Sequence, residues 1–372
     1  MLEKRVVLLG PDPDNGSYST YRYFRVCAER LGRVVGNLRV DAMCPTKTDI
    51  EGRDVGSRAR VWARNYIRWP LHLVKMEADA YHMVDQGLAW YGHVLPRGGR
   101  FVTVHDLINY LTYLGELPFK PLKWRRMLGV LECVSEIRRA DHVFAISNFT
   151  ASALVKYLDI QPRKISVTPN CADEHFRRYS DTQIVAARAR LFGNSEYVII
   201  CVGSNAEYKN RLGALRVFSI LQRKMKNVYL HIVGGRASEM EMAFIKELDL
   251  KKSVNYWGQL PVEELVFFYN SADALLFTST YEGFGLPPLE AMQCGCPVVS
   301  TSCASLREVV GAAALTVDNP LDVEKMASYL VEILKDEIVR RNLRSLGLCQ
   351  ASKFTVARSM QGIAEAYQRF LA

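Results

Sequence analysis

Short apolar runs rich in β-branched residues recur along the chain, and helical patterns lie between most of them. Strands and helices that alternate in this way form βαβ units with parallel sheets. About eleven such runs exceed the roughly six strands of one doubly wound sheet. The predicted fold class is therefore α/β, with two Rossmann-like domains. The expected strands are Arg5–Gly10, Val34–Val40, Ala80–Val84, Phe101–His105, His142–Ser147, Lys164–Thr168, Tyr197–Gly203, Val228–Gly234, Ala274–Thr280, Pro297–Thr301 and Ala314–Val317.

A polar stretch near residues 170–182 separates the end of one strand from a renewed helical pattern. We therefore expect an N-terminal domain over residues 1–172 and a C-terminal domain over residues 182–355. The last helical pattern, residues 356–372, can pack back on the first domain or stay with the second. Two such domains would place a cleft between the carboxyl ends of their sheets, where ligands of this architecture bind.

The length of 372 residues suits two domains, and 49% hydrophobic and 23% charged residues are usual for a globular protein. The net charge of +9 is uneven: residues 1–180 hold 27 Lys and Arg against 19 Asp and Glu, and the remainder holds 21 against 20. Nine cysteines without disulfide or zinc spacing indicate reduced thiols. Because no run approaches the ~18 apolar residues of a membrane span and no signal-peptide core is present, we expect a cytoplasmic protein.

The most informative segment, residues 281–299, has the pattern of a strand end, a glycine loop, a helix and a strand. Gly283 and Gly285 permit a tight turn with exposed backbone N–H groups, and two prolines suit the first helical turn. Such a loop at a helix N-terminus suits a pyrophosphate. Glu282 and Glu290 can both face the cleft, where carboxylates accept hydrogen bonds from sugar or ribose hydroxyls. The alternative is a tight turn with a solvent-exposed glutamate.

This segment resembles the E-x7-E signature of the retaining glycosyltransferases of family 4, which move a sugar from a nucleotide donor. The run from Glu282 to Glu290 is almost identical to the family's consensus sequence. The resemblance implies the GT-B fold, with two Rossmann-like domains whose parallel sheets face each other across a central cleft. It also implies that Glu282 positions the donor sugar and that Glu290 binds the ribose. The loop residues implied to bind the donor are Gly283, Phe284, Gly285 and Leu286.

Other segments match the family in the same order along the chain. The run from Gly203 to Asn210 resembles a Gly-x5-Lys-Asn element, which implies that Lys209 binds the donor phosphates. Taken alone, Lys209 has the character of a surface lysine. Family members often carry an arginine beside the lysine or the glycine. Neither position is basic here, so Arg211 is the candidate for the second cation.

Three further elements of the resemblance concern the nucleotide and its phosphates. Gly234 belongs to a strand-and-glycine element that lies beside the nucleotide in the family, and Leu260 is implied to lie near the base. Gly16 and Ser17 stand where the family has a small glycine loop near the donor phosphates. That loop often holds two glycines in the family, and here it holds one.

His105 and Asp106 follow a predicted strand and resemble the family's His-Asp pair. A histidine at the carboxyl end of a strand can bond the transferring sugar or share in proton handling. Without the resemblance, His105 has the pattern of a structural histidine. Asp106 either holds His105 or caps the next helix.

Residues 58–69 in the basic half are both basic and aromatic. On a helix the arginines would share one face and the aromatic residues another, which suits an anionic membrane surface. Alternatively, the aromatic residues pack on the domain and the arginines are solvated. The arginines are Arg60, Arg64 and Arg68, the aromatic residues are Trp62, Tyr66 and Trp69, and a second basic group comprises Lys120, Lys123, Arg125 and Arg126.

The predicted function is a retaining, metal-independent glycosyltransferase with catalytic residues His105 and Glu282. It would move a hexosyl group, mannose as first choice, from a nucleoside-diphosphate sugar to a glycan or a lipid-linked glycan. The donor would bind the second domain and the acceptor the first. No cofactor and no nucleic acid is expected, and the basic domain suits the inner membrane surface. The oligomeric state is left open.

Three alternatives remain at this point. A sugar-nucleotide 2-epimerase or hydrolase shares the GT-B architecture, although the E-x7-E motif argues against this function. A nucleic-acid-binding protein is suggested only by the basic charge, and the sequence has no helix-turn-helix, RNA-recognition or zinc-finger signature. A catalytically inactive sugar-nucleotide binder would not need the full set of Glu282, Glu290, Lys209 and His105.

Overall fold

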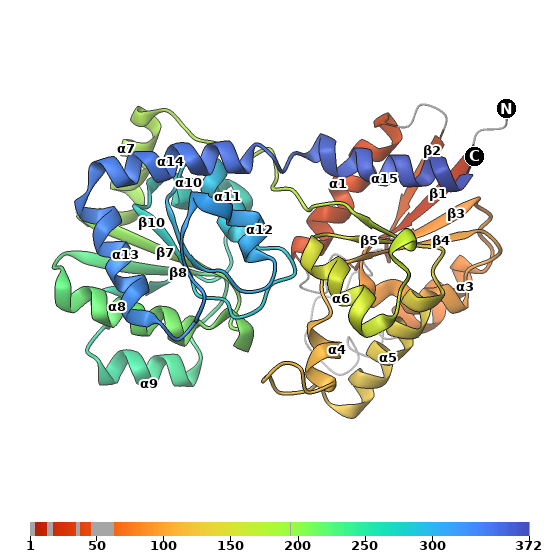
Figure 1. Ribbon diagram of the computed structural model, residues 1–372, viewed down its shortest axis with the longest axis horizontal. Helices are drawn as coiled ribbons and strands as arrows, with labels where there is room; N and C mark the ends of the chain where they lie inside the picture. Colours follow the sequence, from red (N-terminus) through yellow and green to blue (C-terminus); the bar gives the residue numbers. More distant parts are fainter. Residues whose placement is uncertain (1–3, 13–17, 35–37, 46–62, 194, 372) are drawn as a thin grey trace. The chain divides into compact units, whose positions relative to one another are not determined.

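The structure is a computed structural model that describes residues 4–12, 18–34, 38–45, 63–193 and 195–371. The chain divides into two compact units, residues 1–170 with 356–372 and residues 171–355. Each unit is built on one six-stranded sheet in which every described pair of strands is parallel (Figure 1). Helices connect successive strands, as the alternating sequence pattern predicts.

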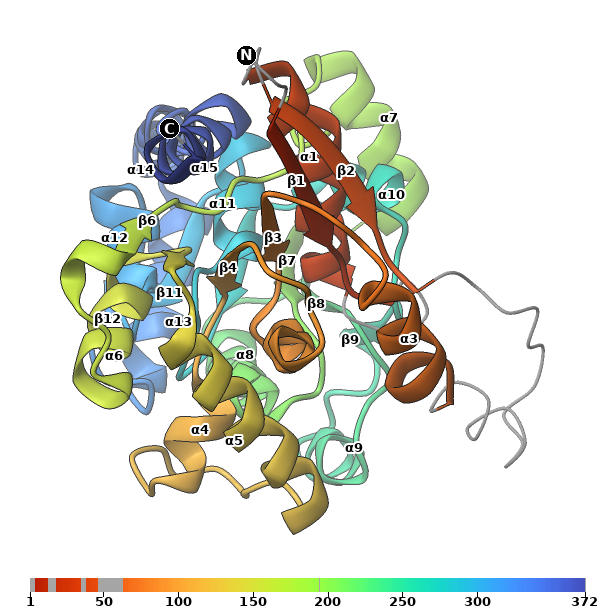
Figure 2. The ribbon, with the colours of Figure 1, turned by 90° about the vertical axis from the view of Figure 1, so that its right-hand side faces the viewer.

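The first sheet has the strand order β2-β1-β3-β4-β5-β6, and its strands β1 and β2 run side by side (Figure 2). The order reverses direction between β1 and β3, which is the switch point of a doubly wound sheet. The strands are β1 (Lys4–Leu9), β2 (Leu38–Met43), β3 (Ala80–Met83), β4 (Gly99–Val104), β5 (His142–Ala145) and β6 (Ile165–Val167). The helices are α1 (Tyr18–Val34), η1 (Arg64–Arg68), α3 (Trp69–Leu73), η2 (Gln86–His93), α4 (Ile108–Tyr113), α5 (Trp124–Arg139), α6 (Asn148–Leu158), η3 (Pro162–Lys164) and α15 (Val356–Leu371).

The final helix α15 belongs to the first unit, although it comes last in the chain. It packs beside α1 (Figure 1) and shares a core with the sheet. The Tyr367 hydroxyl lies 2.5 Å from His82 Nδ1, and His82 Nε2 lies 2.8 Å from Thr103 Oγ1. Burial lowers the pKa of His82 to about 3, so the ring is neutral and serves as both donor and acceptor in this chain of contacts.

The second sheet has the order β12-β11-β10-β7-β8-β9, which is the Rossmann order with its switch point between β7 and β10. The strands are β7 (Tyr197–Val202), β8 (Val228–Val233), β9 (Val254–Tyr256), β10 (Ala274–Phe277), β11 (Val298–Thr301) and β12 (Leu315–Val317). The helices are α7 (Asp181–Phe192), η4 (Glu207–Lys209), α8 (Arg211–Lys224), α9 (Glu239–Glu247), α10 (Val262–Ser271), α11 (Leu286–Gln293), α12 (Leu306–Val310), η5 (Gly311–Ala313), α13 (Val323–Lys335) and α14 (Glu337–Ala351).

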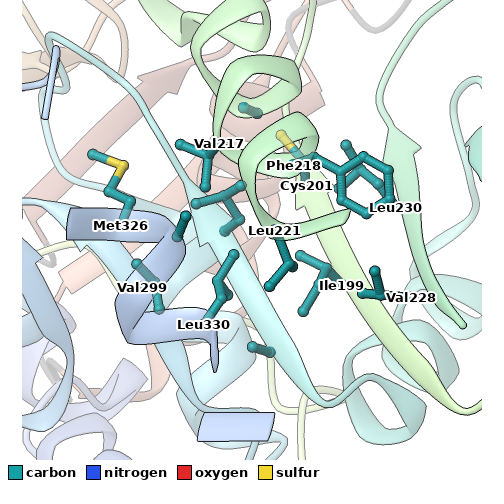
Figure 3. Close-up of a cluster of buried hydrophobic side chains, with 14 of the residues drawn as sticks. Ile199, Cys201, Val217, Phe218, Leu221, Val228, Leu230, Val299, Met326 and Leu330 are labelled. Atoms are coloured by element: carbon teal, nitrogen blue, oxygen red, sulfur yellow. The ribbon is translucent and has the colours of Figure 1, made fainter. Parts of the chain in front are cut away.

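The core of the second unit lies on the face of the sheet covered by α8 and α13 (Figure 3). Strands of a parallel sheet are buried on both faces, which is why β10 is a continuous apolar run and is wholly buried. Figure 3 shows side chains from α8, such as Phe218 and Leu221, among residues of β7 and β8 such as Ile199 and Leu230. This packing fixes where the strands end, and therefore where the loops behind them begin.

Two strand predictions are wrong in detail. The second strand begins at Leu38 instead of Val34, because the amphipathic helix α1 continues through Val34. The short strand β9 was not predicted, since it has three residues and one of them is exposed at the edge of the sheet. The described residues thus hold twelve strands, where about eleven were expected.

Candidate active site

The candidate site lies at the carboxyl ends of β7 and β10, which flank the switch point of the second sheet. Ligands of open α/β sheets bind outside the carboxyl ends of the strands at this point. The loop after β7, residues 203–210, carries Lys209, and the loop after β10, residues 278–285, carries Glu282. Because β7 and β10 are neighbours, the two loops leave the same edge of the sheet side by side.

Lys209 and Glu282 form an ion pair in which Lys209 Nζ lies 2.7 Å from Glu282 Oε1. The Lys209 side chain is 15% exposed and that of Glu282 is 9% exposed. The ammonium group also lies 5.2 Å from the centre of the Tyr208 ring and 5.6 Å from that of Phe277. The structure therefore places a cation and a carboxylate from the two strongest sequence motifs in direct contact.

Backbone and hydroxyl contacts fasten the Lys209 loop to the Glu282 loop. Asn210 has a left-handed backbone (φ 49°), and its Oδ1 caps α8 by accepting from Gly213 N at 3.1 Å. Its Nδ2 donates to Thr278 O at 3.1 Å, and Thr278 Oγ1 donates to Asn210 O at 2.8 Å. Thr280 N donates to Tyr208 O at 2.8 Å. These bonds hold Lys209 in place from both sides.

The glycine loop in front of α11 has the geometry that its sequence predicts. Gly285 is left-handed (φ 109°), and a Cβ there would lie 2.5 Å from Leu306 Cδ2. The Ser305 hydroxyl lies 2.9 Å from the Glu282 carbonyl oxygen and 2.8 Å from the Phe284 carbonyl oxygen. These two contacts hold the loop in place. Leu286 is the first residue of α11, so the two prolines lie in its first turn as predicted. Because Pro287 and Pro288 carry no N–H group, only Leu286 and the loop residues before it can offer backbone N–H groups to an anion at the start of α11.

Glu290 is buried inside the second unit. It is 3% exposed, and its Oε2 accepts a hydrogen bond of 3.0 Å from the Tyr269 hydroxyl. Sequence reasoning expected Glu290 beside the ribose and did not identify Tyr269. The contact itself was not predictable, because Tyr269 reaches Glu290 from α10 across the tertiary structure.

The glycines expected beside the nucleotide lie where neighbouring backbones approach closely. A Cβ on Gly234 (φ 115°) would lie 2.6 Å from Gly203 O, and Gly234 N donates to Gly258 O at 2.6 Å. Leu260 follows β9 in the next loop and is half-buried. The loops after β7, β8 and β9 therefore begin in contact with one another.

Arg211 does not project from the loop as an exposed cation. It is 4% exposed, and its Nε lies 2.7 Å from Oε1 of the equally buried Glu241 in α9. Its guanidinium also lies 5.0 Å from the Tyr256 ring. The sequence does not indicate this pairing, since the two residues are 30 positions apart.

His105 in the first unit lies at the end of β4 and is 7% exposed. Its Nε2 lies 2.9 Å from Val84 O, and a carbonyl can only accept, so Nε2 carries the proton. Its backbone N donates to Gln86 Oε1 at 2.8 Å. Asp106 Oδ1 accepts from Ile108 N at 2.9 Å, the capping role that was one of its two expected alternatives.

Several predicted residues of the first unit lie outside the described residues: Gly16, Ser17, Arg60 and Trp62. Arg64 is described, and the prediction that it shares a solvated basic face is wrong. Its guanidinium is buried and pairs with Asp12, which follows β1. The backbone over Arg64–Arg68 is a π-helix, which changes the angular spacing of an α-helix. Arg68 is exposed and Trp69 is half-buried.

Three findings on the described part of the chain concern metals, membranes and disulfides. There, no three His, Cys, Asp or Glu side chains gather where they could hold a metal ion. Within the same residues, no helix combines the length and the hydropathy needed to cross a bilayer. All nine cysteines are described, and each is a free thiol.

Family models and known proteins match this chain. The model described as Glycosyltransferase Family 4 matches residues 26–176, and the one described as Glycosyl transferases group 1 matches residues 186–347. The serotype-specific mannosyltransferase WbdA of Escherichia coli is 28% identical over 277 residues, which is 72% of this chain and 33% of WbdA. The chain thus spans about a third of the length of that relative.

Solved structures share the fold at low sequence identity. Sucrose-phosphate synthase from Thermosynechococcus elongatus superposes with a TM-score of 0.77 at 18% identity, covering 99% of both chains. Anabaena HepE in complex with UDP-glucose superposes with a TM-score of 0.72 at 17% identity, covering 98% of this chain and 99% of HepE. The two parallel six-stranded sheets therefore form the GT-B fold. The cleft expected between the two units stays a prediction. With its two family models, its relatives and its fold in agreement, the chain belongs to the family 4 glycosyltransferases.

Proposed function

We propose that this protein is a retaining glycosyltransferase that moves a hexosyl group from a nucleoside-diphosphate sugar to a glycan acceptor. The observation that carries the proposal is the ion pair between Lys209 and Glu282 at 2.7 Å, beside the N-terminus of α11. A cation and a helix N-terminus suit a diphosphate, and a carboxylate suits sugar hydroxyls. These three groups together match the two halves of a sugar nucleotide.

The ion pair has to open when the donor binds. Lys209 then moves its charge from the carboxylate to the phosphates, and Glu282 becomes free to accept hydrogen bonds from the hexose. The N–H groups near Gly283 and Gly285 meet the remaining phosphate charge, which grows as the sugar leaves. In this mechanism the protein needs neither a metal nor a cofactor. The acceptor hydroxyl attacks from the face that the diphosphate leaves and passes its proton to the leaving phosphate, so the anomeric configuration is retained.

His105 is proposed to contact the transferring sugar. Because Nε2 donates to Val84 O, a neutral ring has its acceptor lone pair at Nδ1. That atom can accept a hydrogen bond from a hexose hydroxyl. The Val84 contact keeps the ring in one tautomer and one orientation, which is what a positioning contact requires.

We propose mannose as the hexose, because the relative WbdA is named a mannosyltransferase. GDP-mannose is accordingly the first donor to test. The neighbour HepE binds UDP-glucose, so uridine donors form the second group. The first unit would receive the glycan or lipid-linked glycan acceptor.

A basic and aromatic patch on α4 and α5 supports a lipid-linked acceptor at the cytoplasmic membrane surface. Trp124, at the start of α5, is 68% exposed, and Leu128 one turn later is 52% exposed. The two helices pack side by side (Figures 1 and 2), so the exposed residues gather at one end of the first unit. Such a mixture suits anionic headgroups with apolar chains below them. The α4–α5 patch comprises Tyr113, Leu114, Lys120, Lys123, Trp124, Arg125, Arg126 and Leu128.

A thermal-shift screen tests the donor half of this proposal. GDP, UDP, GDP-mannose and UDP-glucose are added to the full chain, with EDTA present throughout. A ligand at 100 times its Kd stabilises the folded state by about 2.7 kcal/mol, which raises the melting temperature by several degrees. We expect at least one diphosphate and its sugar nucleotide to do so. If none of the four raises the melting temperature, the proposed function is wrong.

A further inference from the structure

Six loops follow the six strands of the second sheet at its carboxyl edge, and all of their residues are described. Among these residues, only Lys209 and Arg236 are basic. Lys209 follows β7 and Arg236 follows β8, and these two strands are neighbours. The loops comprise residues 203–210, 234–238, 257–261, 278–285, 302–305 and 318–322.

The loop that carries Arg236 is held from within by the buried pair of Arg211 and Glu241. Arg211 Nη2 donates to the carbonyl oxygen of Arg236 at 3.3 Å. Glu241 Oε2 accepts from Ser238 N at 2.6 Å, and Ser238 Oγ accepts from Glu241 N at 3.2 Å, which forms the capping box of α9. The ion pair therefore ties both ends of the segment Arg236–Ser238 to α8 and α9.

This pair is costly to bury and leaves hydrogen-bonding capacity unused. Both side chains are 3% exposed, and burying two charges is often no more stabilising than burying apolar residues of the same size. Arg211 Nη1 is buried and has no hydrogen-bond partner among the described residues. That atom lies 3.6 Å from the position of a Cβ on Gly235 (φ 143°), so the loop wraps closely around the guanidinium. What the buried pair does provide is a fixed position for the loop over residues 234–238.

The Arg236 side chain differs from that of Arg211 in being exposed. No ion pair among the described residues includes Arg236. Its loop starts against the Lys209 loop, since a Cβ on Gly234 would lie 2.6 Å from Gly203 O. Arg236 is thus an exposed guanidinium, on a fixed loop, next to the loop of the other cation at this edge.

We propose that Arg236 is the second cation for the diphosphate of the donor and that Arg211 with Glu241 is its positioning pair. The inference rests on the proposed function. A diphosphate carries at least two negative charges, and Lys209 alone, with Glu282 beside it, supplies little net positive charge. A guanidinium offers two parallel N–H groups to phosphate oxygens, which suits this task.

The test compares the affinities of full-length variants for GDP and UDP by calorimetry. R236A should weaken binding of whichever diphosphate binds the wild type by about 10-fold to 100-fold, the usual range for losing a charged hydrogen bond. The affinity of R236K should lie between those of R236A and the wild type, because lysine keeps the charge but lacks the two parallel N–H groups of a guanidinium. R223A is the matched control, since Arg223 is exposed at the far end of α8, away from the carboxyl edge. Guanosine and uridine binding, followed by ligand-observed NMR, should be the same in R236A and the wild type.

The positioning pair is tested by removing both of its charges together, because one charge alone would remain buried. R211L/E241L should keep a cooperative unfolding transition and still weaken diphosphate binding. When R211L/E241L is combined with R236A, diphosphate affinity should fall no further than in R236A alone, since the pair acts through Arg236. A further loss of the same size would overturn the positioning role.

The remaining outcomes separate this assignment from the function beneath it. If R236A binds the diphosphate as tightly as R223A does, the assignment is wrong and the proposed function stands. If R236A loses nucleoside and diphosphate affinity equally, Arg236 contacts the base or ribose and the phosphate role is wrong. A wild type that binds neither GDP nor UDP would overturn the proposed function and this assignment together.

Discussion

Lys209 Nζ and Glu282 Oε1 lie 2.7 Å apart, and they come from the two loops that flank the switch point of the second sheet. Each residue belongs to a different sequence motif, and each has a different proposed partner on the donor. In the structure they neutralise each other. Donor binding therefore replaces this ion pair by two contacts, one from Lys209 to the phosphates and one from Glu282 to the hexose. Because the two contacts are made to different parts of the donor, the roles of the two residues can be separated by experiment.

Replacing Glu282 should separate sugar transfer from diphosphate binding. In E282A the hexose loses its carboxylate, so we expect transfer to fall below detection while the fold survives. Free GDP or UDP has no hexose, and Lys209 no longer has to leave a carboxylate. The diphosphate that binds the wild type should therefore bind E282A more tightly, by about 1 kcal/mol or roughly fivefold. E332A, at an exposed position of α13, should match the wild type in both assays. Near-normal turnover in E282A would refute the assignment.

The glycine loop should tolerate no side chain at Gly285. In G285A the new Cβ would meet Leu306 Cδ2 at 2.5 Å on a left-handed backbone (φ 109°). We expect a loss of about 1–3 kcal/mol in the free energy of unfolding, measured by urea denaturation. G129A is the control, because Gly129 lies within α5 and a Cβ there meets nothing within 4 Å. That change should stabilise the protein by about 0.5–1 kcal/mol. Equal effects from the two changes would contradict this account of the loop.

Buried neutral histidines should make the protein less stable in mild acid. Burial lowers the pKa of His231 to about 4, whereas an unfolded chain takes up that proton near pH 6.5. The contribution of the neutral His231 to the free energy of unfolding is complete above pH 6.5. It is lost as the pH falls toward 4, at about 1.4 kcal/mol per pH unit. H231Q, which keeps an acceptor for Trp257 Nε1, should flatten this part of the stability curve between pH 6.5 and 5. H72Q, at an exposed histidine, should follow the wild type. Parallel curves for H231Q and the wild type would show that His231 contributes nothing.

The α4–α5 patch should bind anionic vesicles through its charge. Each basic residue near such a surface contributes about 1 kcal/mol, so K123E/R126E should weaken binding to vesicles with 30% anionic lipid by roughly tenfold or more. K251E/K252E makes the same charge change at exposed positions of the second unit and should bind like the wild type. Sedimentation with the vesicles measures both. If the two double variants lose binding equally, only net charge matters and the patch has no specific role.

The sequence was sufficient for elements whose determinants are local. Strand β10 of the second sheet is a continuous apolar run, and the first turn of α11 is set by two prolines behind Gly285. Contacts that join distant segments were not predictable. Arg211 was the candidate for the second phosphate cation, and its burial against Glu241 was not foreseen, because Glu241 lies 30 positions away in another helix. Arg64 was misplaced for the same reason, since Asp12 reaches it from the end of β1.

The candidate site shows the same division between local and distant determinants. Lys209, Glu282 and Glu290 were found through motifs of contiguous residues. Their mutual geometry depends on the alignment of β7 with β10, which no single motif encodes. Tyr269 was missed because a tyrosine in an amphipathic helix has the pattern of a core residue.

The most direct test of the central claim is the anomeric configuration of the product, read by NMR. The wild type is incubated with GDP-mannose, or with the sugar nucleotide that shifts its melting temperature most, and with a mannose-terminated oligosaccharide acceptor. We expect a new glycosidic linkage with the same anomeric configuration as the donor, and no such linkage from E282A. A product with inverted configuration, or a product formed equally well by E282A, would contradict the central claim.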